Sequence, residues 1–417
     1  MKQKDERGTV WFIHPYSVPP EYPASTRHYH LGSELAKRGW NICLWQSSFI
    51  HPLKRYHPGC SRKLLVKEKR EHMHLYWLWG PPYQTNNWLR SLNMLLWSLL
   101  IILVSLFQKK PCLILGSSPH IFGALAGLLV SKIFRIPFVL EVRDLWPDTL
   151  YDMGAISTGP VSKLLYKLEK WLYKDSCKII ALTKGIKQRI INKGVDSSKI
   201  AFIPNGIHLD SISSAKLTGK SVEVRKTLNL EDKFVCIYTG AHGPANALDS
   251  LIDAAFLLKD EKDIVFLLVG EGQEKPRLVK RAKQSGLNNV IFHDPVPRSE
   301  IGAFIRESDL CILTLKDIPV FDTALPNKLF DYMYENKPIL CTLKGETASL
   351  VQKEDLGTVI SHEKPREMAG VILHLKNNPS LLKCYGTKGR PIIEKDYSFE
   401  KLSYDVEKVI VETLKNK

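Results

Sequence analysis

Residues 234–258 read "FVCIYTGAHGPANALDSLIDAAFLL" and show an apolar run, a glycine turn and a helical stripe in succession. The run at 234–238 is apolar at consecutive positions, which is typical of a strand covered on both faces of a parallel sheet. Gly240 and Gly243 follow in a short turn, where glycine lets the backbone approach a bulky polar ligand closely. One apolar stripe then recurs at helical spacing: Leu248, Leu251, Ile252, Ala255 and Leu258. The stretch predicts a strand, a turn and a helix.

The same alternation of short apolar runs and longer helical patterns fills the rest of the chain, which indicates parallel βα units and an α/β fold. The polar stretch 211–221 interrupts this rhythm, which then restarts, so we expect one domain at 1–206 and a second at 207–397. The helical pattern at 398–417 is expected to return to the first domain. Strands are predicted at 9–13, 41–45, 73–79, 112–116, 137–142, 178–182, 200–204, 234–240, 264–270, 290–294, 309–313, 337–342 and 356–360, and helices at 25–39, 93–110, 121–134, 161–174, 185–194 and 399–415.

The composition favours a folded chain with an anionic partner. Lys and Arg exceed Asp and Glu by 59 to 43, a net charge of +16. The basic residues are scattered and no zinc-finger or ribonucleoprotein pattern occurs, so nucleic acid is not expected as a partner. The 8 cysteines form no CxxC pair and read as reduced, buried cysteines. The first residues, "MKQKDERGTVWFIHP", lack the apolar core of a signal peptide, so a cytoplasmic location is expected.

The segment "NMLLWSLLIILVSLFQKK", residues 93–110, allows two interpretations. Its apolar run extends from Met94 to Phe107, shorter than the roughly 20 residues that span a bilayer. It is either a buried helix of the domain or an interfacial membrane contact flanked by Arg90, Lys109 and Lys110. The sequence leaves both open.

Charged residues end the predicted strand in "PFVLEVRDLWPD", residues 137–148. Glu141, Arg143 and Asp144 follow a buried run, where charges are costly unless they are paired or face a cleft. A role in a ligand site and a structural ion pair both explain them.

The stretch "ALPNKLFDYMYENKPIL", residues 324–340, predicts a helix with Pro326 as its first residue. The free amides of Asn327 and Lys328 then lie at the positive end of the helix dipole, and the ammonium group of Lys328 adds to it. The site is either built for an anion such as a phosphate, or Lys328 is an ordinary solvated side chain. "LLVGEGQEKPRL", residues 267–278, brings Lys275 to the same edge of the predicted sheet.

Six stretches resemble, in order and separation, the large family of retaining glycosyltransferases with the GT-B architecture, family 4 type. They are "PPEYPASTRHYHLGSELAKRGWNI", "LEVRDLWPD", "FIPNGI", "YTGAHGPANALDSLIDAA", "LLVGEGQEKPRL" and "LPNKLFDYMYENKPIL". The likeness is greatest to bacterial enzymes of O-antigen and capsule synthesis, including N-acetylfucosamine-type transferases. It implies two Rossmann-like domains of parallel sheet facing a central cleft, with the nucleotide sugar bound by the second domain and the acceptor by the first.

The resemblance also implies site residues. In the first domain Glu141, Arg143 and Asp144 are the candidates for catalysis and positioning, with Ser17 and Arg27 on the acceptor side. Asp331 occupies the place of the glutamate that contacts the donor ribose. The implied donor-binding set is Gly240, His242, Gly243, Lys275, Val296, Thr323, Pro326, Asn327, Lys328 and Asp331. No metal and no cofactor is implied; the nucleotide sugar is the substrate.

The chain departs from the family pattern at three places. Thr323 stands where the family has its first glutamate, a contact to the sugar. Ala241, His242 and Gly243 replace an Arg and Lys pair, which leaves phosphate charge to Lys328 and Lys275. The loop after the first strand is rich in proline (Pro15, Pro19, Pro20 and Pro23) rather than glycine, so Arg27 or nearby hydroxyls are expected to act there.

The sequence thus predicts a retaining glycosyltransferase of the hexosyltransferase type. The expected donor is a UDP-sugar, an N-acetylated hexosamine or deoxyhexosamine, and the expected acceptor a polyprenyl-diphosphate-linked saccharide of bacterial O-antigen, lipopolysaccharide or capsule synthesis. The expected place is the cytoplasm, peripheral on the inner face of the cytoplasmic membrane. A sugar-nucleotide epimerase of the same fold and a catalytically silent sugar-nucleotide-binding subunit remain alternatives.

Overall fold

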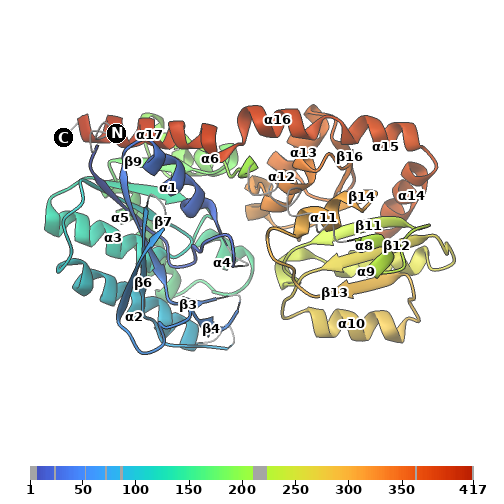
Figure 1. The fold of residues 1–417 in the computed structure, drawn as a ribbon, viewed down its shortest axis with the longest axis horizontal. Helices are drawn as coiled ribbons and strands as arrows, with labels where there is room; N and C mark the ends of the chain where they lie inside the picture. The colour runs from blue at the N-terminus through green and yellow to red at the C-terminus, as the bar shows by residue number, and fades with distance from the viewer. Residues whose placement is uncertain are drawn as a thin grey trace. The chain divides into compact units, whose positions relative to one another are not determined.

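A computed structural model describes residues 7–22, 25–51, 53–70, 73–84, 88–209, 223–361 and 364–415 (Figure 1). The stretch 211–221, Pro23 and His72 lie outside these residues. The chain divides into one compact unit of Met1–Asn205 with Phe399–Lys417, and a second of Gly206–Ser398. These limits fall within one residue of the boundaries expected from the sequence.

The first unit is built on a sheet that has eight strands within the described residues, in the order β10-β9-β8-β7-β1-β2-β6-β5. All neighbouring strands pair in parallel except β5 with β6, which are antiparallel. A short antiparallel pair, β3 with β4, lies apart from it. The strands are β1 (Thr9–Ile13), β2 (Asn41–Ser47), β3 (Phe49–Ile50), β4 (Arg55–Tyr56), β5 (Leu65–Arg70), β6 (Met73–Leu78), β7 (Leu113–Ser117), β8 (Phe138–Val142), β9 (Lys178–Ala181) and β10 (Ile200–Phe202).

Helices cover both faces of this sheet because successive side chains of a strand point to opposite faces. Val10 and Phe12 of β1 pack toward α1 and the C-terminal helix α17, while the Trp11 ring lies 6.0 Å from the Phe134 ring of α3. Glu407 of α17 accepts hydrogen bonds from Arg38 and Trp40, so the last helix belongs to the first unit. The helices are α1 (Arg27–Lys37), α2 (Trp88–Ser105), α3 (Ile121–Phe134), α4 (Asp148–Asp152), α5 (Pro160–Asp175), α6 (Lys184–Asn192) and α17 (Phe399–Lys415), with a 3-10 turn, η1 (Ser197–Lys199).

The second unit has an all-parallel sheet with six strands in the described residues, in the order β13-β12-β11-β14-β15-β16. Val235 and Ile237 of β11 pack in one core with Leu329 and Phe330, and Cys236 and Tyr238 pack in another core on the opposite face. The strands are β11 (Phe234–Thr239), β12 (Ile264–Val269), β13 (Val290–His293), β14 (Leu310–Leu313), β15 (Ile339–Cys341) and β16 (Gly357–Val359).

The helices of the second unit complete the βα units. They are α8 (Val224–Thr227), α9 (Asp249–Leu257), α10 (Lys275–Gln284), α11 (Ile301–Arg306), α12 (Asn327–Tyr334), α13 (Gly345–Lys353), α14 (Pro365–Lys376), α15 (Pro379–Gly386) and α16 (Gly389–Asp396), with 3-10 turns η2 (Pro244–Asn246) and η3 (Pro319–Thr323). In parallel α/β sheets ligands gather where the strands end, at their carboxyl edge. That edge of the second unit is formed by the residues that follow β11, β12, β13 and β14.

Helix α2 is a packed helix of the first unit. Met94, Trp97 and Ile101 are buried against the unit, whereas Leu95, Leu99 and Leu103 are exposed. Among the described residues it is the one helix long and apolar enough, by length and composition, to cross a membrane, and 39% of it is buried. Such a property is shared by core helices, so it does not by itself show a membrane span.

Candidate functional site

Two glycines allow the ends of β11 and β12 to meet. Gly240 has φ +129° and Gly270 has φ +155°, and both lie in the region that favours glycine. A Cβ on Gly270 would lie 1.8 Å from the carbonyl oxygen of Gly240, so no larger residue fits without moving the backbone. The backbones that follow β11 and β12 therefore lie in direct contact at the carboxyl edge of the sheet.

His242 sits in this turn with a buried imidazole ring. Its amide donates to the carbonyl of Glu271 at 2.8 Å, and its carbonyl accepts from the amide of Glu274 at 2.9 Å. Neither ring nitrogen has a hydrogen-bond partner among the described residues. Burial, with a smaller contribution from the charge of Lys275, lowers the pKa of His242 to about 4. The ring is neutral at physiological pH and offers one donor and one acceptor.

Lys328 lies in the first turn of α12, beside this glycine turn. Pro326 immediately precedes the helix in an extended conformation, with φ −64° and ψ 143°, and Asn327 is the first helical residue, which corrects the expected start by one residue. A Cβ on Gly240 would lie 3.4 Å from the Lys328 ammonium nitrogen. The tyrosine hydroxyl of Tyr332 accepts from the amide of Thr239 at 3.0 Å, which fixes α12 against the end of β11.

The ammonium group of Lys328 has no carboxylate partner in the described part of the chain. Its Nζ lies 3.8 Å from the centre of the Tyr238 ring and 3.5 Å from the Oδ1 of Asn246. Burial lowers the pKa of Lys328 to about 7. A half-buried cation with no counter-charge, at the positive end of a helix, is an arrangement that an anion would stabilise.

Lys275, the first residue of α10, differs from Lys328 because its ammonium group has carboxylate partners. Its Nζ donates to Asp294 at 2.7 Å, to the Gly270 carbonyl at 3.0 Å and to Glu271 at 3.3 Å. Burial opposes the charge, but these carboxylates outweigh it and raise the pKa of Lys275. The structure thus places Lys275 at the expected edge and already pairs its charge.

Asp331 is also paired, by a residue that the sequence analysis missed. Both of its carboxylate oxygens accept from the guanidinium group of Arg298, one of them at 2.6 Å. Burial opposes the charge of Arg298, but Asp331 outweighs it and raises the pKa of Arg298. Arg298 lies 33 positions before Asp331 and belongs to no motif, so no local pattern signals the pair. The carboxylate is thus already in an ion pair, and its contact with a donor ribose stays a prediction.

The remaining donor-side residues are spread around the same strand ends. The Thr323 hydroxyl is buried and donates to the Val320 carbonyl at 2.8 Å, inside η3. Val296 packs against the apolar core and Asn327 is exposed.

A hollow of about 220 Å³ begins at Gly243, and it is lined by Gly243, Pro244, Ala247, Leu248, Asp249, Glu274, Arg277, Leu278 and Lys316. A larger hollow, about 690 Å³, lies at the end of α9 and the start of α14, and none of the predicted site residues lines it.

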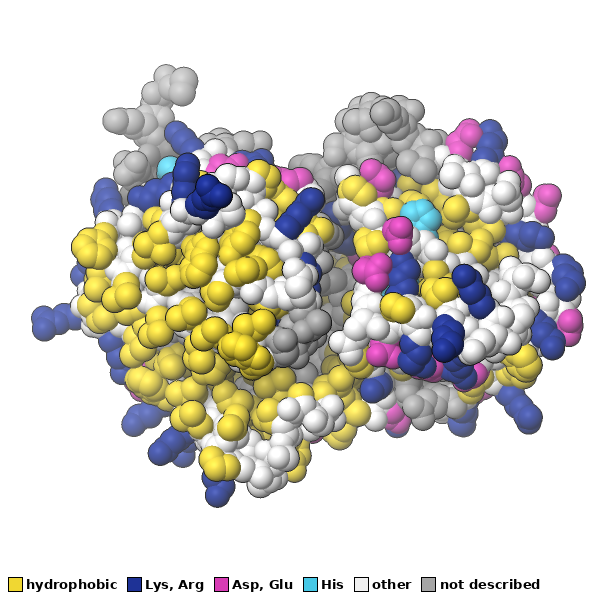
Figure 2. Space-filling model, turned by 90° about the horizontal axis from the view of Figure 1, so that it is seen from below, with side chains coloured by type: hydrophobic (Ala, Val, Ile, Leu, Met, Phe, Trp, Pro, Cys, Tyr) yellow, Lys and Arg dark blue, Asp and Glu magenta, His cyan; other side chains and the backbone are white. Residues whose placement is uncertain are grey.

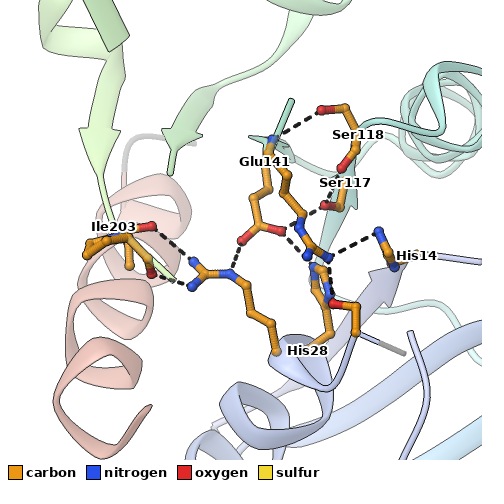
Figure 3. A network of polar contacts seen from close by, with 10 residues as sticks. His14, His28, Ser117, Ser118, Glu141 and Ile203 are labelled. Atoms are coloured by element: carbon orange, nitrogen blue, oxygen red, sulfur yellow. Dashed lines mark hydrogen bonds and ion pairs between the residues drawn. The ribbon is translucent and has the colours of Figure 1, made fainter. Parts of the chain in front are cut away.

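In the first unit, Glu141 of β8 is the centre of a buried polar network (Figure 3). Its Oε1 accepts from the Nε of Arg27 at 2.8 Å, and its Oε2 lies 2.8 Å from the Nε2 of His28 and accepts from the Ser117 hydroxyl at 2.8 Å. Burial alone would raise the pKa of Glu141, but the charges of Arg27 and His28 hold it well below its usual range. Of the two interpretations, the structural ion pair is the one that the structure shows.

The same network corrects the expectation for Arg27. Its guanidinium donates to Glu141 and to the backbone carbonyls of Ile203, at 3.1 Å, and Pro204. It therefore ties α1 to β8 and to the segment after β10, and does not replace the backbone amides of a glycine-rich loop. Ser17 is fully buried, and its hydroxyl has no partner among the described residues.

Arg143 and Asp144 lie at the end of β8, as predicted. The Nη1 of Arg143 donates to the Ser25 hydroxyl at 2.8 Å and lies 3.3 Å from the Nε2 of His14. His14, which the sequence analysis did not single out, stacks on His28 at 4.6 Å, and burial lowers its pKa well below the usual value. The Asp144 side chain is exposed and forms no ion pair with a described residue. Of the predicted catalytic group, Asp144 alone is free to meet a ligand in the described part of the chain.

Comparisons with known proteins agree with this architecture. Residues 24–206 match the model of the glycosyl transferase 4-like domain, and residues 233–378 match that of the glycosyl transferases group 1. WcaI of Escherichia coli (strain K12), assigned to colanic acid biosynthesis, is 28% identical over 227 residues, which are 53% of this chain and 54% of WcaI. The chain thus spans about half the length of this curated relative.

Solved structures share the fold. The Anabaena protein HepE, in complex with UDP-glucose, has a TM-score of 0.70 at 14% identity, covering 97% of this chain and 100% of HepE. WaaG, a glycosyltransferase involved in lipopolysaccharide biosynthesis, has a TM-score of 0.67 at 13% identity, covering 95% and 99%. Two Rossmann-like units with parallel sheets define a GT-B protein. The chain belongs to the glycosyltransferase family, of the family 4 type, because the two matched domains together cover most of it.

Proposed function

We propose that this protein is a retaining glycosyltransferase that moves an N-acetylated hexosamine or deoxyhexosamine from a UDP-sugar to a lipid-linked saccharide. The observation that carries the proposal is Lys328, a half-buried lysine at the start of α12 that has no carboxylate partner among the described residues. A donor diphosphate would meet its ammonium group, the free amides of the helix start and the Gly240 turn together. HepE, with a similar fold, was crystallised with UDP-glucose, which supports a UDP-sugar as the donor class.

The proposed chemistry needs a stabilised leaving group more than a strong base. The bond between the anomeric carbon and the diphosphate oxygen breaks, and negative charge gathers on the diphosphate. Lys328 and the helix amides are fixed before the reaction, so they stabilise this charge without reorganising. The acceptor hydroxyl attacks from the face that the diphosphate leaves, which retains the configuration, and its proton passes to a diphosphate oxygen.

His242 is proposed to contact the donor through one ring nitrogen. A buried imidazole with two unpartnered nitrogens is costly unless a ligand supplies the missing hydrogen bond. Its low pKa keeps it neutral, so it would orient the donor rather than neutralise phosphate charge. The family's first glutamate is absent, and the hydroxyl of Thr323 is used within η3, so sugar orientation is proposed to rest on His242 and on backbone groups.

Asp144 is proposed to position the acceptor in the first unit, because its carboxylate is exposed and forms no ion pair with a described residue. A role in bacterial surface polysaccharide synthesis is supported by WcaI, assigned to colanic acid biosynthesis, and by WaaG, involved in lipopolysaccharide biosynthesis. We propose a lipid-linked saccharide as the acceptor in such a synthesis. The proposed place is the cytoplasmic face of the inner membrane, where such an acceptor presents its saccharide.

A second candidate is a catalytically silent subunit that binds a sugar nucleotide. The pairing of Asp331 with Arg298, and of Lys275 with Asp294, favours it because both leave fewer groups for the donor. Two measurements separate the active transferase from the silent subunit. The first is calorimetric titration with UDP, GDP, ADP and dTDP, and the second is an assay of UDP release with donor and acceptor. Selective UDP binding with acceptor-dependent release is the expected result. Binding without release from any donor would support the silent subunit, and no nucleotide binding would overturn both.

A further inference from the structure

The outward face of α2 is apolar from Leu95 to the end of the helix, and Ser91 is an exposed polar residue before it. The inward face holds Met94, Trp97, Ile101 and Val104, all buried. A helix whose outward face is largely apolar is normally buried or in contact with lipid, because a water-exposed helix carries polar residues on its outer face. The outward apolar positions recur at helical spacing and are exposed by 43% to 86%: Trp88, Leu95, Leu99 and Leu103 and, just after the helix, Leu106 and Phe107.

Helix α3 lies beside α2 and continues this surface. The Trp97 ring of α2 is 5.7 Å from the ring of His120, which caps the start of α3. The outward positions of α3 are Phe122, Leu125, Leu129 and Ile133, and the last of them is 54% exposed. The apolar surface therefore extends over two neighbouring helices.

Helix α5 borders the same layer. The Nζ of Lys132, on α3, lies 5.6 Å from the centre of the Trp171 ring on α5 and pairs with Asp175. Val161 and Leu164 of α5 are exposed by 63% and 56%. We call the exposed apolar residues of α2, α3 and α5, with Leu106 and Phe107, the apolar platform.

A row of lysines runs along α5 at the border of the apolar platform. Lys163, Lys167, Lys170 and Lys174 are exposed and spaced by three or four residues, so they share one side of the helix. None of them forms an ion pair with a described residue. Neither α2 nor α3 contains an acidic residue, and the two acids of α5, Glu169 and Asp175, are paired with Lys193 and Lys132. Apolar groups thus lie next to uncompensated positive charge.

Figure 2 shows hydrophobic side chains gathered on the face of the first unit where α2 lies in Figure 1, with Lys and Arg side chains at the margin. Contiguous exposed apolar patches of this kind are rare on monomeric proteins unless they bind something. We propose that the apolar platform docks on an anionic lipid bilayer, with α2 lying along the interface. This inference rests on the proposed function, since it places the first unit at the membrane that holds a lipid-linked acceptor.

The positive charge of the lysine row favours an anionic bilayer, rather than a second copy of the chain, as the partner of the apolar platform. In a bilayer with acidic headgroups, the acyl chains can bury the leucines while the negatively charged headgroups attract the lysine row. In a twofold contact through this face the lysine row would find no acidic row on the platform helices of the partner copy. One face of α2 is held by the unit, so the helix inserts sideways and does not span.

Flotation with vesicles tests the proposal on the full chain. The vesicles contain phosphatidylethanolamine with phosphatidylglycerol, or phosphatidylcholine alone. The variants are Leu99→Glu with Leu103→Glu on the apolar platform, and Lys163→Glu, Lys167→Glu and Lys170→Glu on the lysine row. The matched control is Phe256→Glu with Leu257→Glu on α9, whose side chains are exposed by 45% and 46% in the second unit. Thermal unfolding and UDP titration accompany each variant.

The wild type is expected to float with anionic vesicles and to be released by salt. The leucine variant should bind at least about tenfold more weakly, and the lysine variant should lose about fivefold for each lysine removed. The control should float as the wild type does, and all variants should fold and bind UDP as the wild type does.

If the wild type binds UDP but does not float with vesicles, the proposal that the apolar platform docks on a bilayer is wrong and the proposed function stands. Equal flotation of the leucine variant would overturn the docking proposal too. A wild-type dimer in sedimentation that the leucine variant converts to a monomer, without vesicle binding, would assign the face to a second copy. Flotation as expected without nucleotide binding would support the platform and contradict the proposed function.

Discussion

The ammonium nitrogen of Lys328 lies 3.8 Å from the centre of the Tyr238 ring, and no carboxylate in the described residues pairs with it. The aromatic face attracts the cation, but it does not replace a counter-ion. Burial lowers the pKa of Lys328 to about 7, so near neutral pH the lysine is balanced between its two forms. An anionic ligand would shift this balance toward the charged form.

The first prediction concerns the donor affinity of Lys328→Met, which keeps the apolar length of the side chain and removes the charge. We expect its Kd for UDP to rise by about tenfold to a hundredfold, the range for a lost charge-assisted hydrogen bond. Calorimetry measures it. Lys275→Met is the matched comparison, and it should change the Kd less because Asp294 already holds that ammonium group. Equal affinities of Lys328→Met and wild type would return Lys328 to an ordinary solvated role.

The second prediction is a pH dependence with a defined sign. A diphosphate binds the charged form of Lys328, so affinity should be highest where the lysine is already protonated and should fall as pH rises from about 7 to about 9, by up to about tenfold per unit. The pH range of the measurement begins at about 7 because the terminal phosphate of UDP itself titrates near 6, which would change affinity below that pH for a separate reason. Lys328→Met should lose this dependence, and a variant that keeps it would assign the titration to another group.

The third prediction concerns the pair of Asp331 and Arg298. Asp331→Asn removes the partner of a guanidinium group whose side chain is 34% exposed, and we expect about 1 to 3 kcal/mol less free energy of unfolding. Arg298→Met should cost a similar amount, and the double variant should be less unstable than the sum of the two. Denaturant unfolding measures all three. Strict additivity of the two losses would show that the pair is not coupled. UDP titration of Asp331→Asn reports separately whether this carboxylate also contacts the donor.

The fourth prediction separates Glu141 from the chemistry. Glu141→Gln should lower the free energy of unfolding by about 3 to 5 kcal/mol, because Arg27 remains buried without its counter-charge. The folded-state pKa of Glu141 is held down, so its contribution is present above the unfolded pKa and is lost as pH falls through the folded value. Acid unfolding should therefore begin at higher pH in the variant. Glu412→Gln, at an exposed pair with Lys178, is the control and should change stability by less than about 1 kcal/mol.

The fifth prediction concerns Asp144 at the end of β8, which is exposed and has no ion-pair partner in the part of the chain that the structure describes. Asp144→Asn should lower the rate of sugar transfer by at least about tenfold, as expected for a positioning group, and should leave the Kd for UDP within about twofold of the wild type. Steady-state transfer and calorimetry are compared on the same preparation. Equal losses in transfer and nucleotide binding would contradict a role on the acceptor side.

The fold was predictable because its signals are local. Consecutive apolar residues at 234–238 and the helical stripe after Gly243 are determined by the period of each element. Strand β5 was missed, since Leu65–Arg70 is an edge strand with lysine, glutamate and arginine in its sequence and lacks the continuous apolar run of the others. Glycine turns and the start of α12 were also found within one residue.

The candidate site was predictable only in its positions along the chain. Gly240, His242 and Lys328 meet at one edge because parallel strands end together, which the sequence implied. Which charges are free depends on contacts between distant residues, such as Arg298 with Asp331 and Arg27 with Glu141. No spacing rule connects positions 33 or 114 residues apart, so the pairing of these carboxylates emerged only from the structure.

The most direct test is the number of protons taken up when UDP binds at about pH 8, measured by calorimetry in buffers of different ionisation heat. At this pH most of the free protein has Lys328 uncharged, so binding a diphosphate should draw a large fraction of one proton from the solvent. Lys328→Met should bind more weakly and take up none. UDP binding without proton uptake in the wild type, or uptake of the same size in the variant, would contradict a diphosphate site at Lys328.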